Sequence, residues 1–222
     1  LSYFGIQKSQ EELGQELRPN QNPEGDNDDK SVTLDELEIK TQEYDVIAYH
    51  RPIGNIEILK KFIAQDIPVI TLSWMNRNDD IGHYRIIKGY DDNTQTLIQD
   101  DPYQGKGLTS TYDDFTYLWS KYNYEYLIIA PKDKTKIIET IIAEDLNKTT
   151  AWQKAANNNL EKLKIDQDDI YSRFNLSVAY YHLKKFDKSV EEFEKIEIRL
   201  PANTLWYQIE PIRSYYELGN YN

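Results

Sequence analysis

Apolar positions recur at helical intervals in the first third of the chain. Residues 7–17 carry a short, mostly polar helical pattern, and Thr33 with Glu36 three residues later forms a capping box that opens a second helix. A third helix is predicted over residues 55–66, where Asn55 is the cap. Its apolar stripe consists of Ile58, Leu59, Phe62 and Ile63.

Strand-like patterns follow the first two helices. Residues 44–51 alternate weakly, and residues 67–74 form a continuous apolar run that is typical of a buried strand. Residues 82–105 predict a hairpin around a turn rich in Asp and Asn, and residues 125–131 a closing strand after a helix at 112–122. Helices before an antiparallel sheet indicate an α+β domain that ends near Pro131.

Two parts are expected from these patterns. Residues 1–132 form the α+β domain, and residues 133–222 form an all-α region. The opening stretch "LSYFG" has the pattern of the last turn of an apolar helix that Gly5 ends, so we expect the domain to lack its N-terminal part. The final "YYELGNYN" likewise stops where another helix is expected.

The all-α region contains a repeat with a period of 35 residues. Tyr180-Tyr181 recurs as Tyr215-Tyr216, and Phe186 recurs as Tyr221. This period predicts paired helices stacked as tetratricopeptide repeats. The large residues and the closing proline of that pattern are Leu176, Tyr180, Phe186, Phe193 and Pro201. Ser177 and Ser189 stand where the pattern usually has Gly and Ala.

Charge excludes one class of partner. The 222 residues have a net charge of −12, and residues 1–132 hold 13 Lys and Arg against 23 Asp and Glu. The negative electrostatic field of such a chain disfavours the binding of nucleic acid, which is itself negatively charged. No apolar run is long enough to span a membrane, and the chain has no cysteine, which excludes disulfides and thiolate metal sites within it.

The hairpin brings a histidine and a carboxylate together. A turn centred on Asp92 places His83 directly opposite Asp101, and side chains in such a pair lie about 4.5–5.5 Å apart at Cβ. A slip of one residue would bring in Asp100 instead. A histidine held by a carboxylate is two thirds of a nucleophilic triad, although a purely structural contact at a strand end is the alternative interpretation.

The stretches "GHYRIIKGYDD" and "IQDDPYQG" resemble the His and Asp blocks of the bacteriocin-processing (double-glycine leader) peptidase-like family, which are papain-fold cysteine peptidases. "LSYFG" and "LKKFIAQDIPVIT" extend the likeness, and "LPANTLWYQIEPIRSYYELGNY" is similar to the repeat tail that some bacterial members carry. The resemblance implies that His83 is the general base and that Asp101 orients it.

In this family the nucleophile is a cysteine in a Cys-Gly-Pro sequence, which would lie about nine residues before Leu1, with an oxyanion-hole Gln a little earlier. The resemblance therefore predicts hydrolysis of a peptide bond in a peptide or protein substrate, aided by a protein partner on the repeats. It also suggests an extracytoplasmic location. The alternative is a catalytically silent fold that acts as a binding or scaffolding module through the repeats.

Other features predict no cofactor or metal site. His50 and His182 have no ligand-spaced partner and are interpreted as surface or packing residues. Residues 26–37 resemble a calcium loop only in part, and are interpreted as a solvated loop followed by a helix cap. Trp74 and Tyr103 flank the expected cleft but fit ordinary packing.

Overall fold

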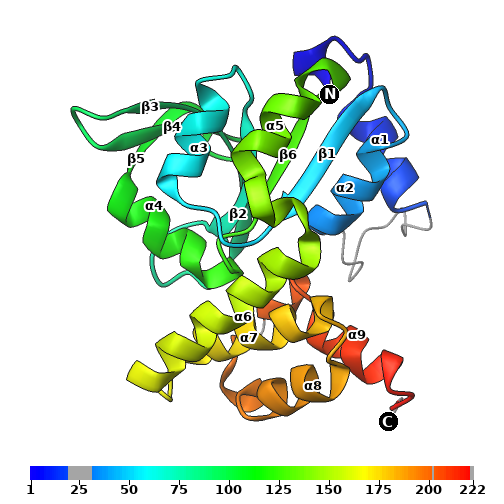
Figure 1. The fold of residues 1–222 in the computed structure, drawn as a ribbon, viewed down its shortest axis with the longest axis vertical. Coiled ribbons are helices and arrows are strands. Elements are labelled where there is room, and N and C mark those ends of the chain that lie inside the picture. Colours follow the sequence, from blue (N-terminus) through cyan, green and yellow to red (C-terminus); the bar gives the residue numbers. More distant parts are fainter. Residues whose placement is uncertain (20–31, 202, 221–222) are drawn as a thin grey trace.

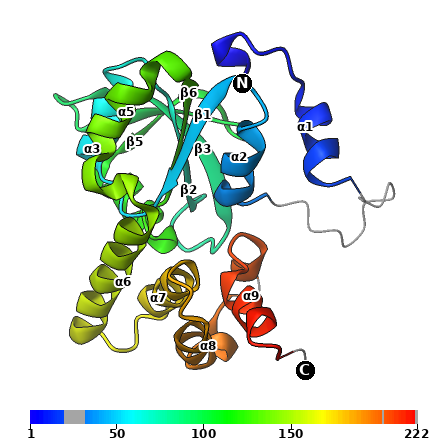
Figure 2. The same cartoon turned by 45° about the vertical axis from the view of Figure 1, so that its right-hand side comes forward.

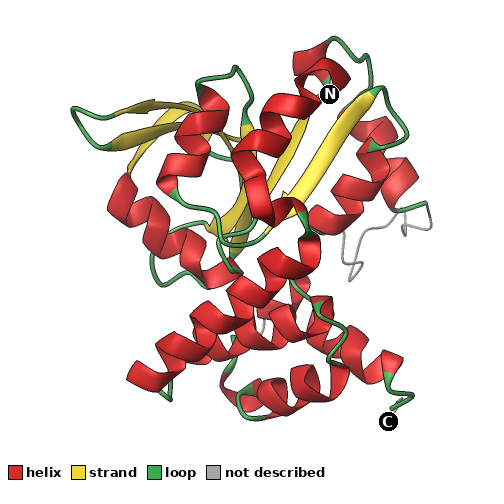
Figure 3. Cartoon of the chain, in the orientation of Figure 1, coloured by secondary structure: helices red, strands yellow, loops and turns green. Residues whose placement is uncertain are grey.

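A computed structural model describes residues 1–19, 32–201 and 203–220. Within these residues one antiparallel sheet of six strands is present, in the order β1-β6-β2-β3-β4-β5 (Figure 1). The strands are β1 (Val46–Arg51), β2 (Val69–Trp74), β3 (Gly82–Asp91), β4 (Thr96–Asp101), β5 (Gly105–Thr111) and β6 (Tyr126–Pro131). The mixed helical and antiparallel composition agrees with the α+β prediction (Figure 3).

Helices precede, interrupt and follow the sheet. They are α1 (Gln10–Leu17), α2 (Leu34–Thr41), α3 (Ile56–Ile63), α4 (Tyr112–Trp119), α5 (Thr135–Ile142), α6 (Lys148–Ile165), α7 (Ile170–His182), α8 (Phe186–Glu194) and α9 (Glu210–Glu217). Short 3₁₀ turns are η1 (Ser2–Phe4), η2 (Ser120–Tyr122), η3 (Lys132–Lys134), η4 (Ala143–Leu146), η5 (Glu197–Arg199) and η6 (Thr204–Trp206). No helix among the described residues combines the length and apolar character needed to cross a bilayer.

The predicted helix caps are present. The Thr33 hydroxyl accepts a hydrogen bond from the Glu36 N–H, and the Glu36 carboxylate accepts one from the Thr33 N–H. Asn55 accepts from the Ile58 N–H at the start of α3. Gly5 ends η1 with a φ of 78°, a conformation that glycine adopts without strain. Local hydrogen bonding thus fixes these ends as the sequence predicted.

The two faces of the sheet are covered by different helices. Helices α3, α4 and α5 pack on one face, where Phe62, Phe115 and Ile138 belong to a single buried cluster. Helix α2 covers the other face, with Leu34 against Leu72 and Leu127. Figure 2 shows α3 and α5 on one side of the strands and α2 on the other. Helix α5 lies after Pro131, where the α+β domain was expected to end. Its Ile138 and Ile142 nevertheless belong to the buried cluster that covers the sheet.

Strand β5 was not predicted. Its sequence, "GKGLTST", is dominated by Gly, Ser and Thr, which favour turns, and its side chains are exposed or half-buried. It lies at an edge of the sheet, where pairing with β4 and not burial of a side-chain face holds it in place.

Helices α6 to α9 form the helical region, which lies against the end of the sheet where β3 begins. Gly82 leaves no space for a side chain, because a Cβ there would lie 2.4 Å from the Tyr207 ring. The Trp74 ring packs edge-on against Tyr171 of α7, with ring centroids 4.8 Å apart. Asn123 donates to the Asn175 carbonyl of α7 at 2.9 Å. The two predicted parts therefore share a buried junction, and the division at residue 132 stays a prediction.

The small residues of the predicted repeat meet in the core of the helical region. The Ser177 hydroxyl on α7 donates to the Ser189 carbonyl on α8 at 2.6 Å, and Ser214 on α9 donates to the Ser189 hydroxyl at 2.8 Å. Short polar side chains thus let three helices approach closely. The tetratricopeptide assignment itself stays a prediction, and Tyr221 lies outside the described residues. Residues 26–31 of the predicted solvated loop also lie outside them.

Candidate active site

The hairpin register differs from the predicted one. Ile86 lies opposite Asp100 and Ile87 opposite Gln99, and beyond an irregularity at Lys88 the register shifts by one towards the turn. Continued by one residue, this register sets Arg85, and not His83, across from Asp101. The predicted pairing of His83 directly opposite Asp101 is wrong by two positions, because the turn spans residues 92–95 and a bulge adds one residue to β3.

His83 nevertheless contacts Asp101. Its Nε2 lies 2.8 Å from Asp101 Oδ1, so the contact is diagonal across the two strands. An error of two residues keeps both side chains on the same face, because side chains alternate with a period of two. Asp100 points elsewhere: its carboxylate pairs with Lys88 at 2.6 Å and accepts from the Gly107 N–H at 2.8 Å. The expected partner of His83 is therefore present, although the expected register is not.

The Asp-Pro sequence shapes the carboxylate site. Asp101 Oδ1 accepts from the backbone N–H groups of Tyr103 and Gln104 at 2.8 and 2.7 Å, which closes a tight turn over Pro102. Pro102 has no N–H that would compete for this acceptor. Burial alone would raise the pKa of Asp101, but the Gln104 N–H, His83 and the Tyr103 N–H outweigh it and lower that pKa. Asp101 is thus held as a carboxylate.

Arg85 occupies the other side of the same carboxylate. Its Nε donates to Asp101 Oδ2 at 3.0 Å, and its side chain is 3% exposed. Arg85 was not predicted as a site residue. A charged residue two positions after the histidine, on the same face of a predicted strand, was the available signal.

The second ring nitrogen of His83 is left for another group. Nδ1 makes no hydrogen bond within the described part of the chain, and the side chain is 14% exposed. Because Asp101 accepts from Nε2–H, the neutral ring presents Nδ1 as an acceptor. His83 is the second residue of β3, so Nδ1 lies near the end of the sheet.

A cavity of about 600 Å³ lies beside this pair. Arg85 and Gln104 line it together with Gln99, Phe115 and residues 107–110. His83 is not among its lining residues. Of the aromatic residues expected at the cleft, Trp74 is buried and Tyr103 is exposed.

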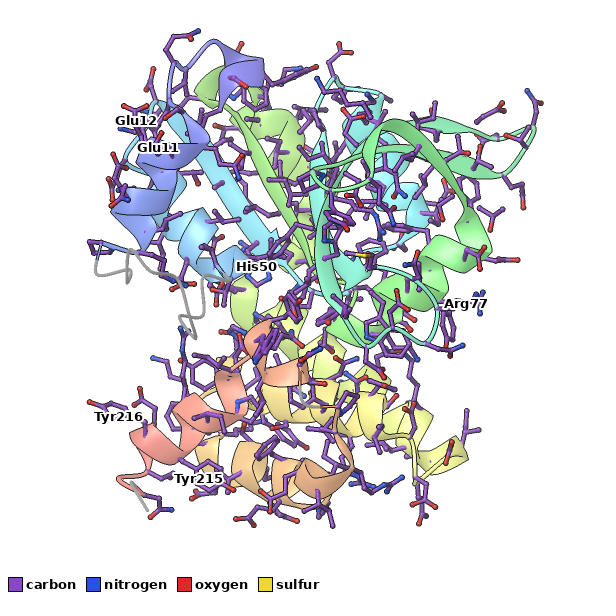
Figure 4. The ribbon with its side chains drawn as sticks, turned by 180° about the vertical axis from the view of Figure 1, so that it is seen from behind. Glu11, Glu12, His50, Arg77, Tyr215 and Tyr216 are labelled. Atoms are coloured by element: carbon purple, nitrogen blue, oxygen red, sulfur yellow. The ribbon has the colours of Figure 1, made fainter. Side chains whose placement is uncertain are left out.

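The His50 side chain is buried and that of His182 is only 7% exposed, so their interpretation as surface residues is wrong and that as packing residues holds. Figure 4 shows His50 between the sheet and the helical region. Its Nδ1 lies 2.6 Å from Asp35 Oδ1 and its Nε2 lies 2.7 Å from Glu125 Oε2. Burial lowers the pKa of His50, but Asp35 and Glu125 outweigh it and raise that pKa to about 9. Both nitrogens are occupied, so His50 has no atom left for proton transfer.

His182 has the opposite electrostatic behaviour. Its ring stacks on Trp152 with centroids 3.8 Å apart, and burial lowers its pKa to about 3. Glu210 lies 3.8 Å from His182 Nε2, and burial raises the pKa of Glu210 to about 8. At neutral pH both side chains are therefore uncharged.

One group of side chains among the described residues has the spacing of metal ligands. It consists of Asp35, Glu38 and His50. Lys148 already supplies a cation there, because its Nζ lies 2.7 Å from Asp35 and 2.8 Å from Glu38. The arrangement is an ion-pair cluster that joins α2 and β1 to α6. Its partners are far apart in the sequence, which is why the residue pattern did not reveal it.

Comparison with known proteins identifies the sheet domain. The model of the Peptidase C39 like family matches residues 1–130, a range that includes His83, Arg85 and Asp101. A search of curated proteins found no match.

Proposed function

The chain belongs to the Peptidase C39 like family, and we propose that its sheet domain hydrolyses a peptide bond in a peptide or protein substrate, with His83 as general base and Asp101 as the residue that orients it. The observation that carries this proposal is the hydrogen bond of 2.8 Å between His83 Nε2 and Asp101 Oδ1. It fixes the ring and leaves Nδ1 for the proton of a nucleophile.

The proposed reaction follows the cysteine peptidase pattern. His83 Nδ1 takes the thiol proton, and the thiolate attacks the substrate carbonyl carbon. As the C–N bond breaks, the imidazolium returns that proton to the leaving amine and a thioester remains. Water, deprotonated by the same nitrogen, then attacks the thioester and releases the acid and the thiol. Asp101 stabilises the imidazolium throughout and stays ionised.

The nucleophile is proposed to be a cysteine upstream of Leu1, because the 222 residues contain none. Leu1 and Phe4 line a cavity of about 490 Å³ with Pro68 and Ile86, towards the end of the sheet where β2 begins. A helix of about nine residues is roughly 14 Å long. The strand from Pro68 to Ser73, which pairs with His83, covers roughly 17 Å. A helix along this face would therefore reach the end of the sheet at which His83 lies, on the face that Ile86 occupies and opposite to the His83 side chain.

The helical region is proposed to bind a protein partner or a segment of the substrate. Stacked helix pairs present extended surfaces, and such surfaces are the usual binding sites of repeat proteins. The contacts of Tyr207 and Tyr171 with Gly82 and Trp74 support a role close to the active site.

The absence of cysteine from the chain favours one competing function, a silent peptidase-like fold that acts as a scaffold. The residue before the upstream Gly-Pro decides between them: a cysteine supports hydrolysis, and any other residue there removes the proposal. With a cysteine present, the protein should react with a thiol-directed peptidase probe, and His83→Ala should abolish that labelling. Asp100→Asn is the matched control and should label normally. Undiminished labelling of His83→Ala would exclude His83 as the base.

A further inference from the structure

The contacts of Arg85 show that it is more than a neighbour of the active-site pair. We propose that Arg85 is a positioning residue, which acts as the buried counter-ion of Asp101 and thereby keeps His83 neutral and correctly oriented. The inference rests on the proposed role of His83 as general base. Arg85 itself contacts no reacting atom in this scheme, and it acts through Asp101.

Every nitrogen of the Arg85 side chain has an acceptor. Nε donates to Asp101 Oδ2 at 3.0 Å, and Nη1 donates to the Ser73 hydroxyl and the Trp74 carbonyl, both at 3.0 Å. Nη2 donates to the Met75 carbonyl at 2.7 Å. The planar guanidinium is thus fixed between β4 and the end of β2, in a geometry that a lysine ammonium cannot reproduce.

This anchor divides the Asp101 carboxylate between two tasks. Oδ2 is taken by Arg85, while Oδ1 accepts from His83 and from the turn that follows. Rotation of the carboxylate would break bonds on both sides. Because the Asp101 side chain is 0% exposed, water does not compete for either oxygen. The acceptor that sets the ring orientation of His83 therefore has one position.

Charge gives Arg85 its second effect. A buried carboxylate without a counter-ion is costly, and it favours a proton on any adjacent base. In the described residues the side chains paired with Asp101 that can carry a positive charge are Arg85, which is permanently charged, and His83, which is charged only when protonated. With Arg85 in place the carboxylate is balanced, so His83 does not have to be protonated. Without it, an imidazolium would be the remaining counter-ion, and a protonated ring cannot accept a thiol proton.

The same guanidinium connects the pair to the neighbouring cavity. Arg85 and Met75 both line the cavity of about 600 Å³, and Arg85 holds the Met75 carbonyl. A movement of the loop that follows β2 would therefore be transmitted to Asp101 through the Arg85 side chain.

Nitrogen NMR of the His83 imidazole in the 222-residue chain tests the inference, because the ring shifts distinguish the Nε2–H tautomer, the Nδ1–H tautomer and the imidazolium. Arg85→Gln removes the charge and Arg85→Lys keeps it. We expect the protonation equilibrium of His83 in Arg85→Gln to move about tenfold towards the imidazolium. Arg85→Lys should move it less. Ser73→Ala, which removes one anchor of Arg85 without changing charge, should leave it unchanged.

Equal His83 spectra in folded Arg85→Gln and wild type would overturn the proposal and leave Arg85 a purely structural residue. Should Arg85→Gln unfold, Arg85→Lys is the deciding variant. A shift of the His83 protonation equilibrium towards the imidazolium supports the proposal, and a spectrum equal to that of wild type overturns it. These spectra need no nucleophile, so they are independent of peptidase activity. If Arg85→Gln shows the spectral shift but the protein hydrolyses no peptide even with its nucleophile present, only the proposed function is contradicted.

Discussion

His83 reaches Asp101 diagonally across β3 and β4, with Nε2 and Oδ1 2.8 Å apart, and not from the directly opposed position. The bulge at Lys88 makes this possible. In the register near the turn Tyr90 lies opposite Leu97, and if that register continued along the hairpin, Asp101 would lie opposite Ile86, on the face away from His83. One additional residue in β3 returns the carboxylate to the face of the imidazole.

Replacing Asp101 by Asn should therefore affect His83 more than any other substitution in the β3–β4 hairpin. The amide cannot stabilise an imidazolium, and its NH₂ group favours the wrong tautomer, so we expect kcat/KM for peptide hydrolysis to fall by about 10²-fold or more. Steady-state kinetics on the protein that carries its nucleophile measures this. Asp100→Asn removes a carboxylate that pairs with Lys88, and it should change the rate little. Equal losses in the two variants would argue against a specific role for Asp101.

The sequence predicted features that depend on neighbouring residues. The capping box of Thr33 and the Asn55 cap involve residues three positions apart, so they are visible in the pattern itself. The His83 contact was also predicted, because an error of two residues in register preserves the face. The bulge at Lys88 was not, since a bulge depends on how two strands pair and not on a residue type that marks it.

The ion cluster around His50 was missed for a related reason. Its partners Asp35, Glu125 and Lys148 lie 15, 75 and 98 positions away, so no local spacing links them. Burial by the helical region, which the sequence did not place, gives them their role.

The junction beside His83 should be sensitive to a single methyl group. In Gly82→Ala the new Cβ would lie 2.4 Å from the Tyr207 ring and 2.6 Å from the Tyr122 hydroxyl, so the helical region or β3 must shift. We expect a loss of about 1–3 kcal/mol in the free energy of unfolding, as for other overpacked sites. Urea denaturation followed by circular dichroism measures it.

Gly14→Ala is the control for that substitution. Gly14 lies in α1 with no atom near the added Cβ, so the same change there should stabilise the helix by up to about 1 kcal/mol. If Gly82→Ala were as stable as wild type, Tyr207 would not pack against β3 in solution.

Stability should decrease at alkaline pH because two buried groups hold protons in the folded state. The pKa of His50 is raised from 6.5 to about 9 by Asp35 and Glu125 against the effect of burial, so its contribution is complete below pH 6.5 and is lost as pH rises through 9. The pKa of Glu210 is raised by burial from 4.5 to about 8, which lowers stability between those values. Urea denaturation at pH 6, 7, 8 and 9 should show a continuous decline.

His182 acts in the opposite direction at low pH. Burial lowers its pKa from 6.5 to about 3, so the unfolded chain takes up the proton first and stability falls as pH decreases from 6.5 towards 3. The free energy of unfolding should therefore be largest on the acidic side of neutrality, between the loss of stability at low pH and the loss at alkaline pH.

His50→Gln separates the two alkaline contributions. The amide can still donate to a carboxylate, but it carries no charge, so Asp35 and Glu125 lose a buried counter-ion and we expect a loss of about 3 kcal/mol at pH 6. The decline between pH 8 and 9 should become much smaller in this variant, because Glu210 is already about half deprotonated at pH 8 and has little of its contribution left to lose. The decline below pH 8 should remain. A wild-type slope between pH 8 and 9 in His50→Gln would show that another group titrates in that range and that His50 is not protonated in the folded state.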